Sequence, residues 1–229
     1  MSTQLDHLVY ATPDLAATTE AITMQLGVAP VVGGSHVGRG TANTLLALGE
    51  GAYLEIVGPD PAQPHPASPR PFGVDDLTAA RLVTFAIRVP SMETALADAR
   101  AGGYDPGEAE AMKRATPDGT VLSWTLTRPT ISGPSAGIVP FLVDWLDSPH
   151  PSQTIGAAVR LREFIVASPD RRRVGETFAA LGLAIGVERA DAPLLTAVIE
   201  GPTGSVTLSG AVPAPRRATS GDPGREDRS

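Results

Sequence analysis

The feature that most constrains the fold is a segment that occurs three times: a short apolar strand, a capped helix start and a glycine stop. The first copy begins LDHLVYATP at residues 5–13, where Thr12 is a good N-cap and Pro13 suits the first helical position. The same order returns at residues 82–103 and 159–182. Such a repeat predicts supersecondary units that pack against one another to build a shared core.

Each helix is followed by several strand-like runs separated by turn residues, so each copy reads β-α-β-β-β. This order predicts an α+β fold, with units at residues 1–60, 82–150 and 156–210. A proline-dense connector is expected at residues 61–81, and a disordered tail is expected at residues 211–229 because it has almost no large apolar residue.

Composition excludes several classes of protein. The 229 residues are 42% hydrophobic, which is enough for a core in one or two domains. The net charge of -7 argues against a nucleic-acid or anionic-membrane partner, because both reward a basic surface. No apolar run approaches the ~18 residues that span a bilayer, and the start MSTQLDHLVY lacks the features of a secretory signal. We therefore expect a cytoplasmic protein.

The absence of cysteine limits the chemistry that the chain can carry. It rules out a disulfide framework, a thiolate nucleophile and a cysteine-based zinc site. The dinucleotide-binding GxGxxG loop, the phosphate-binding P-loop and the GxSxG nucleophile elbow are also missing. Any metal ion would need histidine, carboxylate and water ligands.

Three stretches carry a resemblance to a known family: LDHLVYATPDL at 5–15, HVGRGTANTLLALGEGAYLEIVGPDP at 36–61, and VPFLVDW at 139–145 followed by Pro149-His150-Pro151. Together with the paired units, they resemble the glyoxalase-like branch of the vicinal oxygen chelate superfamily. The likeness spans about residues 4–210. It implies that repeated βαβββ units form a curled, mixed or antiparallel sheet cup.

The resemblance also implies a metal site. In this family, ligands lie on the first and last strands of a unit and point into the cup, at positions occupied here by His7 and Glu55. In the second unit Thr84 aligns with His7 and Asp144 with Glu55, while Glu163 falls opposite His7 in the third. The implied cofactor is a divalent ion such as Zn, Ni, Mn or Fe, which accept nitrogen and oxygen ligands.

Strand patterning supports a special role for Glu55. Its neighbours Leu54 and Ile56 are large and apolar, so an unpaired carboxylate buried there would cost several kcal/mol. We interpret Glu55 as the catalytic residue, a ligand or a substrate contact, with a structural pairing to an arginine as the alternative. Regular alternation places His7 and Asp6 on opposite strand faces. A lone histidine in an apolar strand is either a hydrogen-bonded core residue or a functional one.

Four further residues are predicted to contact a substrate: His36, Arg39, Asn43 and Asp144. The first two lie in the glycine-rich segment GGSHVGRGT, which is a mobile hairpin or a loop over the mouth of the cup. Arg39 either clamps a substrate carboxylate bidentately or is solvated. His150, within SPHPS, shapes a turn or, as the resemblance implies, joins the site.

Two functions remain open. In the first, a divalent ion held by His7 and Glu55 coordinates two oxygens of a small substrate while a carboxylate moves a proton, as in a lyase or isomerase. In the second, the same cup binds a small molecule, such as an antibiotic or a metabolite, without a metal. The third unit either packs on an open sheet edge or pairs across a homodimer.

Overall fold

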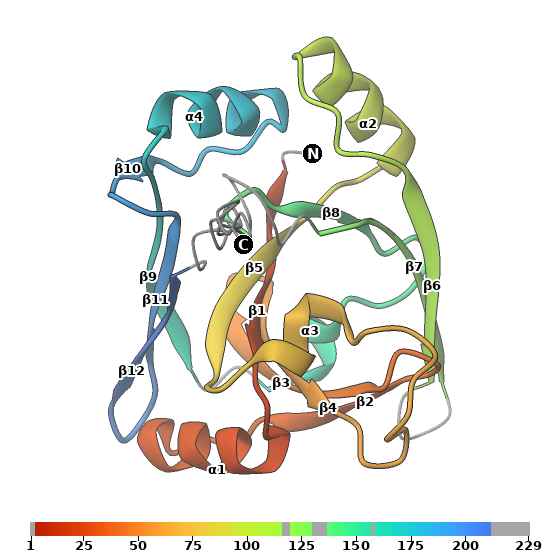
Figure 1. Cartoon of the computed structure of the whole chain (residues 1–229), viewed down its shortest axis with the longest axis vertical. Coiled ribbons are helices and arrows are strands. Elements are labelled where there is room, and N and C mark those ends of the chain that lie inside the picture. The colour runs from red at the N-terminus through yellow and green to blue at the C-terminus, as the bar shows by residue number, and fades with distance from the viewer. Residues whose placement is uncertain (1–2, 116–119, 130–136, 157–158, 212–229) are drawn as a thin grey trace, which may run out of the picture.

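The computed structural model describes residues 3–115, 120–129, 137–156 and 159–211, which form two β-sheets (Figure 1). The larger sheet contains β1 (Gln4–Ala11), β2 (Val31–His36), β3 (Thr41–Gly49), β4 (Ala52–Pro59), β5 (Arg81–Arg88), β6 (Ala109–Ala115), β7 (Val121–Thr127) and β8 (Phe141–Asp144). The smaller sheet contains β9 (Arg160–Ser168), β10 (Val187–Arg189), β11 (Leu194–Glu200) and β12 (Ser205–Ala211). The helices are α1 (Leu15–Leu26), η1 (Pro71–Asp76, a 3-10 helix), α2 (Met92–Ala101), α3 (Pro151–Thr154) and α4 (Arg171–Ala180).

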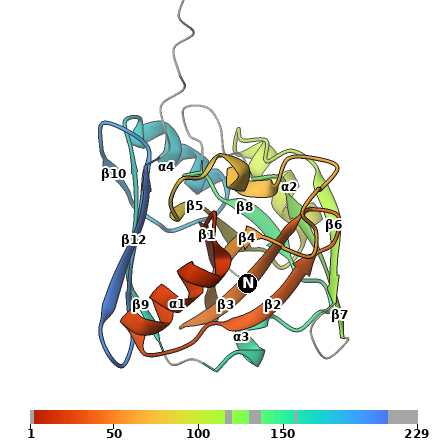
Figure 2. The same ribbon diagram turned by 60° about the horizontal axis from the view of Figure 1, so that its bottom comes forward.

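The larger sheet consists of two matching halves, in the strand order β2-β3-β4-β1-β5-β8-β7-β6. At its centre β1 pairs antiparallel with β5, and each of them pairs in parallel with the last strand of its own half, β4 or β8. The edge strands β2 and β6 contact each other, so the sheet curls into a nearly closed cup (Figure 2). This confirms the α+β cup that the resemblance implies.

The helix starts follow the sequence signals with one shift. Ser91 caps α2 as expected, because its side chain accepts a hydrogen bond from the backbone N–H of Thr94. In the first half, however, Asp14 is the N-cap of α1. The hydroxyl of Thr12 accepts a hydrogen bond from the Asp14 backbone N–H instead. The predicted cap at Thr12 is therefore two residues early. The Thr12 side chain stabilises the loop before the helix by its hydrogen bond with Asp14.

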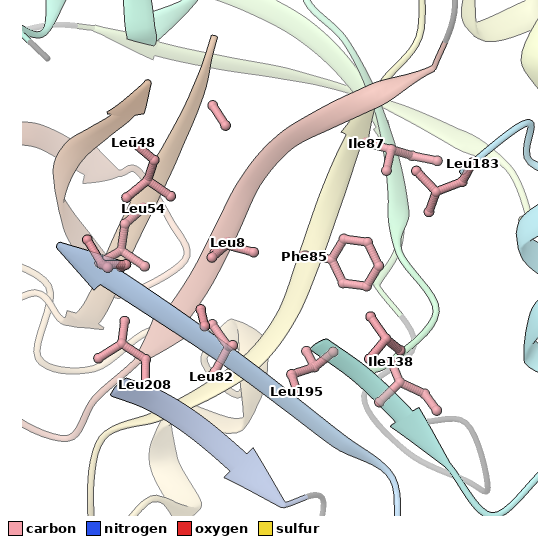
Figure 3. Close-up of a cluster of buried hydrophobic side chains, with 14 of the residues drawn as sticks. Leu8, Leu48, Leu54, Leu82, Phe85, Ile87, Ile138, Leu183, Leu195 and Leu208 are labelled. Carbon is pink, nitrogen blue, oxygen red and sulfur yellow. The ribbon is translucent and has the colours of Figure 1, made fainter. Parts of the chain in front are cut away.

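The smaller sheet covers the outer face of the cup. Leu8 from β1 and Phe85 from β5 point away from the cup interior and pack in one buried cluster with Leu195 from β11 and Leu208 from β12 (Figure 3). The sequence allowed two packings of the third segment, on an open sheet edge or across a homodimer. Within one chain it packs face-on instead, because the outer face of β1 and β5 is apolar.

The third segment keeps the order of elements along the chain but changes their pairing. In the first half the opening strand β1 lies beside the last strand β4. In the smaller sheet, whose order is β10-β9-β11-β12, the opening strand β9 lies between the second and third strands. A similar sequence pattern therefore gives a different sheet, and this part of the chain does not form another half-cup.

The proline-dense connector lies against the cup. Residues 68–72 line its interior, and Arg70 donates to the carbonyl oxygen of Gly40 at 2.8 Å. Of the predicted tail at residues 211–229, Ala211 is the last residue of β12, and the rest lies outside the described residues. In the described part of the chain, no helix has the length and apolar character needed to cross a membrane.

Candidate active site

The cup encloses a cavity of about 530 Å³. Its lining comes from both halves of the larger sheet and from the connector. His7, Asn43 and Glu55 reach it from β1, β3 and β4, and charged side chains also reach it from β6 and the connector. Four aromatic rings from β4, β7, β8 and the segment after β8 add apolar wall: Tyr53, Trp124, Phe141 and Trp145. The three stretches that carry the family resemblance, far apart in the sequence, each contribute residues to this cavity or to the groups directly behind it.

A β-bulge brings Asp6 beside His7. In the pairing of β1 with β5, Leu5 lies opposite Ile87 and His7 lies opposite Ala86, so one residue, Asp6, has no partner. Such a bulge re-aims the side chain of the extra residue. The sequence prediction that Asp6 and His7 point to opposite faces is therefore wrong at this position.

Asp6 is fully buried and accepts hydrogen bonds from three side chains. One oxygen, Oδ1, lies 2.6 Å from Nδ1 of His7. The other, Oδ2, accepts from Nε1 of Trp145 and from Nε2 of His150, both at 2.9 Å. Burial, the largest single influence, would raise the pKa of the Asp6 carboxyl, but the hydrogen-bonding and electrostatic interactions with His150 and His7 together outweigh it and hold this pKa well below its usual range. Asp6 is thus a carboxylate that only accepts hydrogen bonds.

His150 is fixed as a neutral ring. Its Nδ1 accepts a hydrogen bond from the backbone N–H of Ser152 at 3.2 Å, so Nδ1 carries no proton. The proton is on Nε2, which donates it to Asp6. His150 therefore caps α3 and anchors Asp6, a larger role than shaping a turn.

Glu55 is buried on β4, and Asn43 holds one of its oxygens. Nδ2 of Asn43 donates to Oε1 of Glu55 at 2.6 Å, while Oδ1 of Asn43 accepts from Nη1 of Arg114 at 3.3 Å. A guanidinium only donates and a carboxylate only accepts, so these two contacts fix the orientation of the amide. The arrangement gives the buried carboxylate of Glu55 a hydrogen-bond donor, which is one of the partners that the burial argument from sequence required.

His36 is the second neutral ring of the site. Its Nε2 lies 3.2 Å from the donor Nδ2 of Asn43, and its Nδ1 lies 2.9 Å from the hydroxyl of Thr41. Burial lowers the pKa of His36, and this effect exceeds the opposing attraction of Glu55. Nε2 therefore accepts, and Nδ1 carries the proton and donates to Thr41.

One proton position between His7 and Glu55 is left open. Asp6 fixes a proton on Nδ1 of His7, because a carboxylate cannot donate. On the other side of the ring, Nε2 lies 3.6 Å from Oε2 of Glu55. Either atom can hold a proton there. The His7 ring is held in place by stacking on Tyr53, with ring centroids 4.7 Å apart.

The donor set does not fit the tightly held divalent ion that the resemblance implies. The lone pair on Nε2 of His36 points at the Asn43 amide and is not free to bind a metal ion. This leaves Nε2 of His7 and Oε2 of Glu55 as the atoms that could coordinate one. Catalytic zinc sites use three protein ligands. Among the described residues, no group of three or more His, Asp or Glu side chains is placed to hold a metal.

Strand register explains why the second half adds no ligand. β1 and β5 pair symmetrically, so Thr84 takes the place of His7 and Ala86 takes the place of Val9. Val9 lies opposite Glu55, and Ala86 lies opposite Phe141. The counterpart of Glu55 is therefore Phe141.

The sequence alignment had assigned this position to Asp144. That carboxylate lies outside the cavity lining, where it accepts the backbone N–H groups of Met92 and Leu146, each at 2.9 Å. Glu163 lies on the smaller sheet, also outside the cavity lining. Neither residue is brought to the His7–Glu55 pair.

The other predicted contacts do line the cavity. His36, Arg39 and Asn43 lie there with His7 and Glu55. Nη2 of Arg39 lies 3.8 Å from Oε2 of Glu110. Sequence reasoning did not single out Asp6, Trp145 or Arg114 as site residues. Trp145 stands within a motif stretch, whereas the Asp6 bulge and the position of Arg114 in the cavity have no local sequence signal.

The curled sheet of paired βαβββ halves, with a carboxylate–histidine cluster at its centre, defines a glyoxalase-like protein of the vicinal oxygen chelate superfamily. The glyoxalase-like domain family matches residues 5–182, and the chain belongs to this family. No curated protein matches the sequence.

Several solved structures are similar. A hypothetical protein from Staphylococcus aureus has 15% identity over 90% of this chain and 85% of its own, with a TM-score of 0.61. Methylmalonyl-CoA epimerase from Mycobacterium tuberculosis has 20% identity over 66% of this chain and 90% of its own, with a TM-score of 0.42. Methylmalonyl-CoA epimerase from Streptomyces coelicolor, in complex with 2-nitronate-propionyl-CoA, has 19% identity over 66% of this chain and 100% of its own, with a TM-score of 0.44. The first likeness supports the fold.

Proposed function

We propose that this protein is an enzyme that moves a proton on a small oxygen-bearing molecule bound in the cup, as a lyase or isomerase does. The observation that carries the proposal is the open proton position between Nε2 of His7 and Oε2 of Glu55. The hydrogen bonds of Asp6, His36 and His150 fix the other protons of the network. Proton exchange is therefore concentrated at one pair of atoms on the cavity wall.

In this proposal Glu55 is the catalytic base. Its Oε2 takes a proton from a carbon next to a carbonyl group, and a proton on Nε2 of His7 passes to the carbonyl oxygen to form an enol. Where the neighbouring carbon carries a hydroxyl group, the enol is an enediol: Nε2 of His7 takes the proton of that second hydroxyl and Glu55 returns its proton to the carbon of the original carbonyl, which gives an isomer. Where that neighbouring carbon, on the far side of the carbon that lost its proton, carries a leaving group, Nε2 of His7 takes back the enol proton and the group departs with the proton held by Glu55, which gives a lyase product. Asn43 keeps Oε1 occupied, so that Oε2 is the oxygen that reacts.

No step of this mechanism passes through a metal. The open donors at His7 and Glu55 would make at most a weak site for Zn, Ni, Mn or Fe. Metal content of protein purified without chelators is the direct check. Stoichiometric metal that is lost on both His7→Ala and Glu55→Ala would replace the proposed acid–base pair by a metal centre.

A metal-free binding protein is the second candidate. The aromatic wall of Tyr53, Trp124, Phe141 and Trp145 favours it, since flat rings hold a small molecule without any chemistry. In that case Glu55 orients a ligand by hydrogen bonding only.

Deuterium exchange separates the two candidates. The protein is incubated in D₂O with lactate, 2-oxobutyrate, phenylpyruvate and dihydroxyacetone, and the C–H signals next to oxygen-bearing carbons are followed by NMR. We expect exchange of at least one compound, lost in Glu55→Gln and reduced in His7→Gln. Exchange that is the same in Glu55→Gln contradicts the proposal. Binding without exchange in the wild type favours the second candidate.

A further inference from the structure

We propose that Arg114 binds a carboxylate group of the molecule held in the cup, so that the substrate class is a small organic acid. This inference rests on the proposed function only in taking the cup as the ligand site. Arg114 comes from β6, lines the cavity and is 6% exposed. Its side chain donates to a neutral oxygen, Oδ1 of Asn43, at 3.3 Å.

Arg114 differs from the other arginines that line the cavity. Arg70 pairs with Asp75 at 2.5 Å, and Arg128 pairs with Glu110 at 2.5 Å. Arg39 lies 3.8 Å from Glu110. Within the part of the chain that the structure describes, no carboxylate lies within ion-pair distance of Arg114. It is the most deeply buried of these cations, and it is the one without a charged partner.

A buried cation without a counter-ion is costly, because the lost hydration is not replaced by an opposite charge. A guanidinium has five N–H donors in a planar fork that matches a carboxylate bidentately. One of these donors is used by Asn43. A ligand carboxylate would supply the missing charge and accept from the remaining donors.

The charge of the cavity points the same way. Its described lining holds four arginines, Arg39, Arg70, Arg114 and Arg128, against two glutamates, Glu55 and Glu110. The whole chain carries a net charge of -7. A cationic cavity in an acidic protein selects anions, since the local field attracts them while the rest of the surface repels them.

Backbone geometry at β2 makes room for the guanidinium. A Cβ atom at Gly33 would lie 2.7 Å from Nη1 of Arg114 and 2.2 Å from Oδ1 of Asn43. Only a residue without a side chain fits here. Arg114 from one edge of the sheet therefore reaches across to β2 and β3 at the other edge. The same contact closes the seam of the cup, so its structural role and its ligand role must be tested separately.

The position of Arg114 also fixes where the reactive carbon would lie. Asn43 bridges Arg114 and Glu55, because its amide oxygen accepts from the first and its amide nitrogen donates to the second. An acid whose carboxylate lies on Arg114 presents the adjacent carbon on the side of Glu55. This geometry favours 2-hydroxy and 2-oxo acids, with an apolar body against Trp124 and Phe141.

The experiment measures binding of lactate, 2-oxobutyrate and 3-phenyllactate beside their neutral amides, by calorimetry and by the rise in melting temperature. We expect at least one acid to bind at millimolar concentration and its amide to bind at least tenfold more weakly. Arg114→Gln should weaken the acid at least tenfold, and Arg114→Lys should weaken it less because the positive charge remains. The matched control is Arg172→Gln, on α4 outside the cavity lining with 79% of its side chain exposed; it makes the same change in net charge and should change affinity little.

Comparison of Arg114→Lys with Arg114→Gln separates a charge effect from a folding defect, and acid binding by Glu55→Gln separates carboxylate recognition from the proposed catalysis. Arg114→Lys retains the charge, so a folded Arg114→Lys that binds acids beside a folded Arg114→Gln that does not shows a charge effect. Equal binding of acid and amide, no binding of any acid, or unchanged acid affinity in Arg114→Gln overturns the inference. Acid binding that depends on Arg114 but persists in Glu55→Gln, with no deuterium exchange in the wild type, supports the inference while the acid–base proposal fails.

Discussion

Nδ1 of His7 lies 2.6 Å from Oδ1 of Asp6, although the two residues are adjacent in one strand. Neighbours in a regular strand point to opposite faces, and the contact exists because the pairing of β1 with β5 is bulged at Asp6. The bulge gives His7 a carboxylate behind its ring and leaves Nε2 facing Glu55. A backbone irregularity thus determines which nitrogen of His7 faces Glu55.

The first prediction concerns Asp6→Asn. The amide nitrogen cannot accept a hydrogen bond, so at least one of His7, Trp145 and His150 loses its acceptor in a fully buried site. We expect a loss of about 3 kcal/mol in the free energy of unfolding, measured with urea. The control Asp105→Asn removes an exposed ion pair with Arg100 and should change the free energy of unfolding little, because solvent screens exposed pairs. Equal losses in both variants would contradict this role for Asp6.

The cup was predictable from the sequence, whereas the contacts at its base were not. Helix caps and glycine stops repeat locally, so they reveal the units, and the apolar neighbours of Glu55 reveal a carboxylate that needs a partner. Strand register is set by pairing between distant segments, and a motif such as PFLVDW does not state it. This is why Asp144 was aligned where Phe141 lies, and why Asp6 was placed on the opposite face.

The second prediction concerns the pH dependence of stability. The pKa of His36 is lowered by burial in the folded state, so the unfolded chain binds this proton more readily. The contribution of neutral His36 is complete above pH ~6.5 and is lost as the pH falls through the lowered folded-state pKa. When the pH is lowered from about 7 to about 5, through the range in which this proton binds, the free energy of unfolding should fall less in His36→Gln than in the wild type. The control is His65→Gln, a change at an exposed side chain of the connector, and it should keep the wild-type slope.

The third prediction concerns Gly33→Ala. The added methyl group would lie 2.2 Å from Oδ1 of Asn43, so either Asn43 and Arg114 move or the strand does. Overpacking of this kind costs about 1–3 kcal/mol, and the displaced Asn43 should also release Glu55 and lower the rate of deuterium exchange. Gly175→Ala, inside α4 with no atom within 4 Å of the new methyl group, is the matched control. It should stabilise the protein by roughly 0.5–1 kcal/mol, and the opposite ranking would contradict the packing argument.

The fourth prediction concerns Phe141→Glu. Phe141 is the register counterpart of Glu55, and its ring lies edge-on to His7 with centroids 5.5 Å apart. A carboxylate at this position would join His7 Nε2 and Glu55 Oε2, which brings the donor set to the three protein ligands of a catalytic zinc site. Without metal the variant should be less stable than the wild type, because a buried ring is lost and like charges face each other. Zn²⁺ or Mn²⁺ should bind to Phe141→Glu stoichiometrically and raise its melting temperature. The control is Phe141→Gln, because glutamine has the shape of glutamate without its charge, and this variant should respond to metal as the wild type does. Equal metal responses in the two variants would show that register alone does not explain why the second half of the cup lacks a ligand.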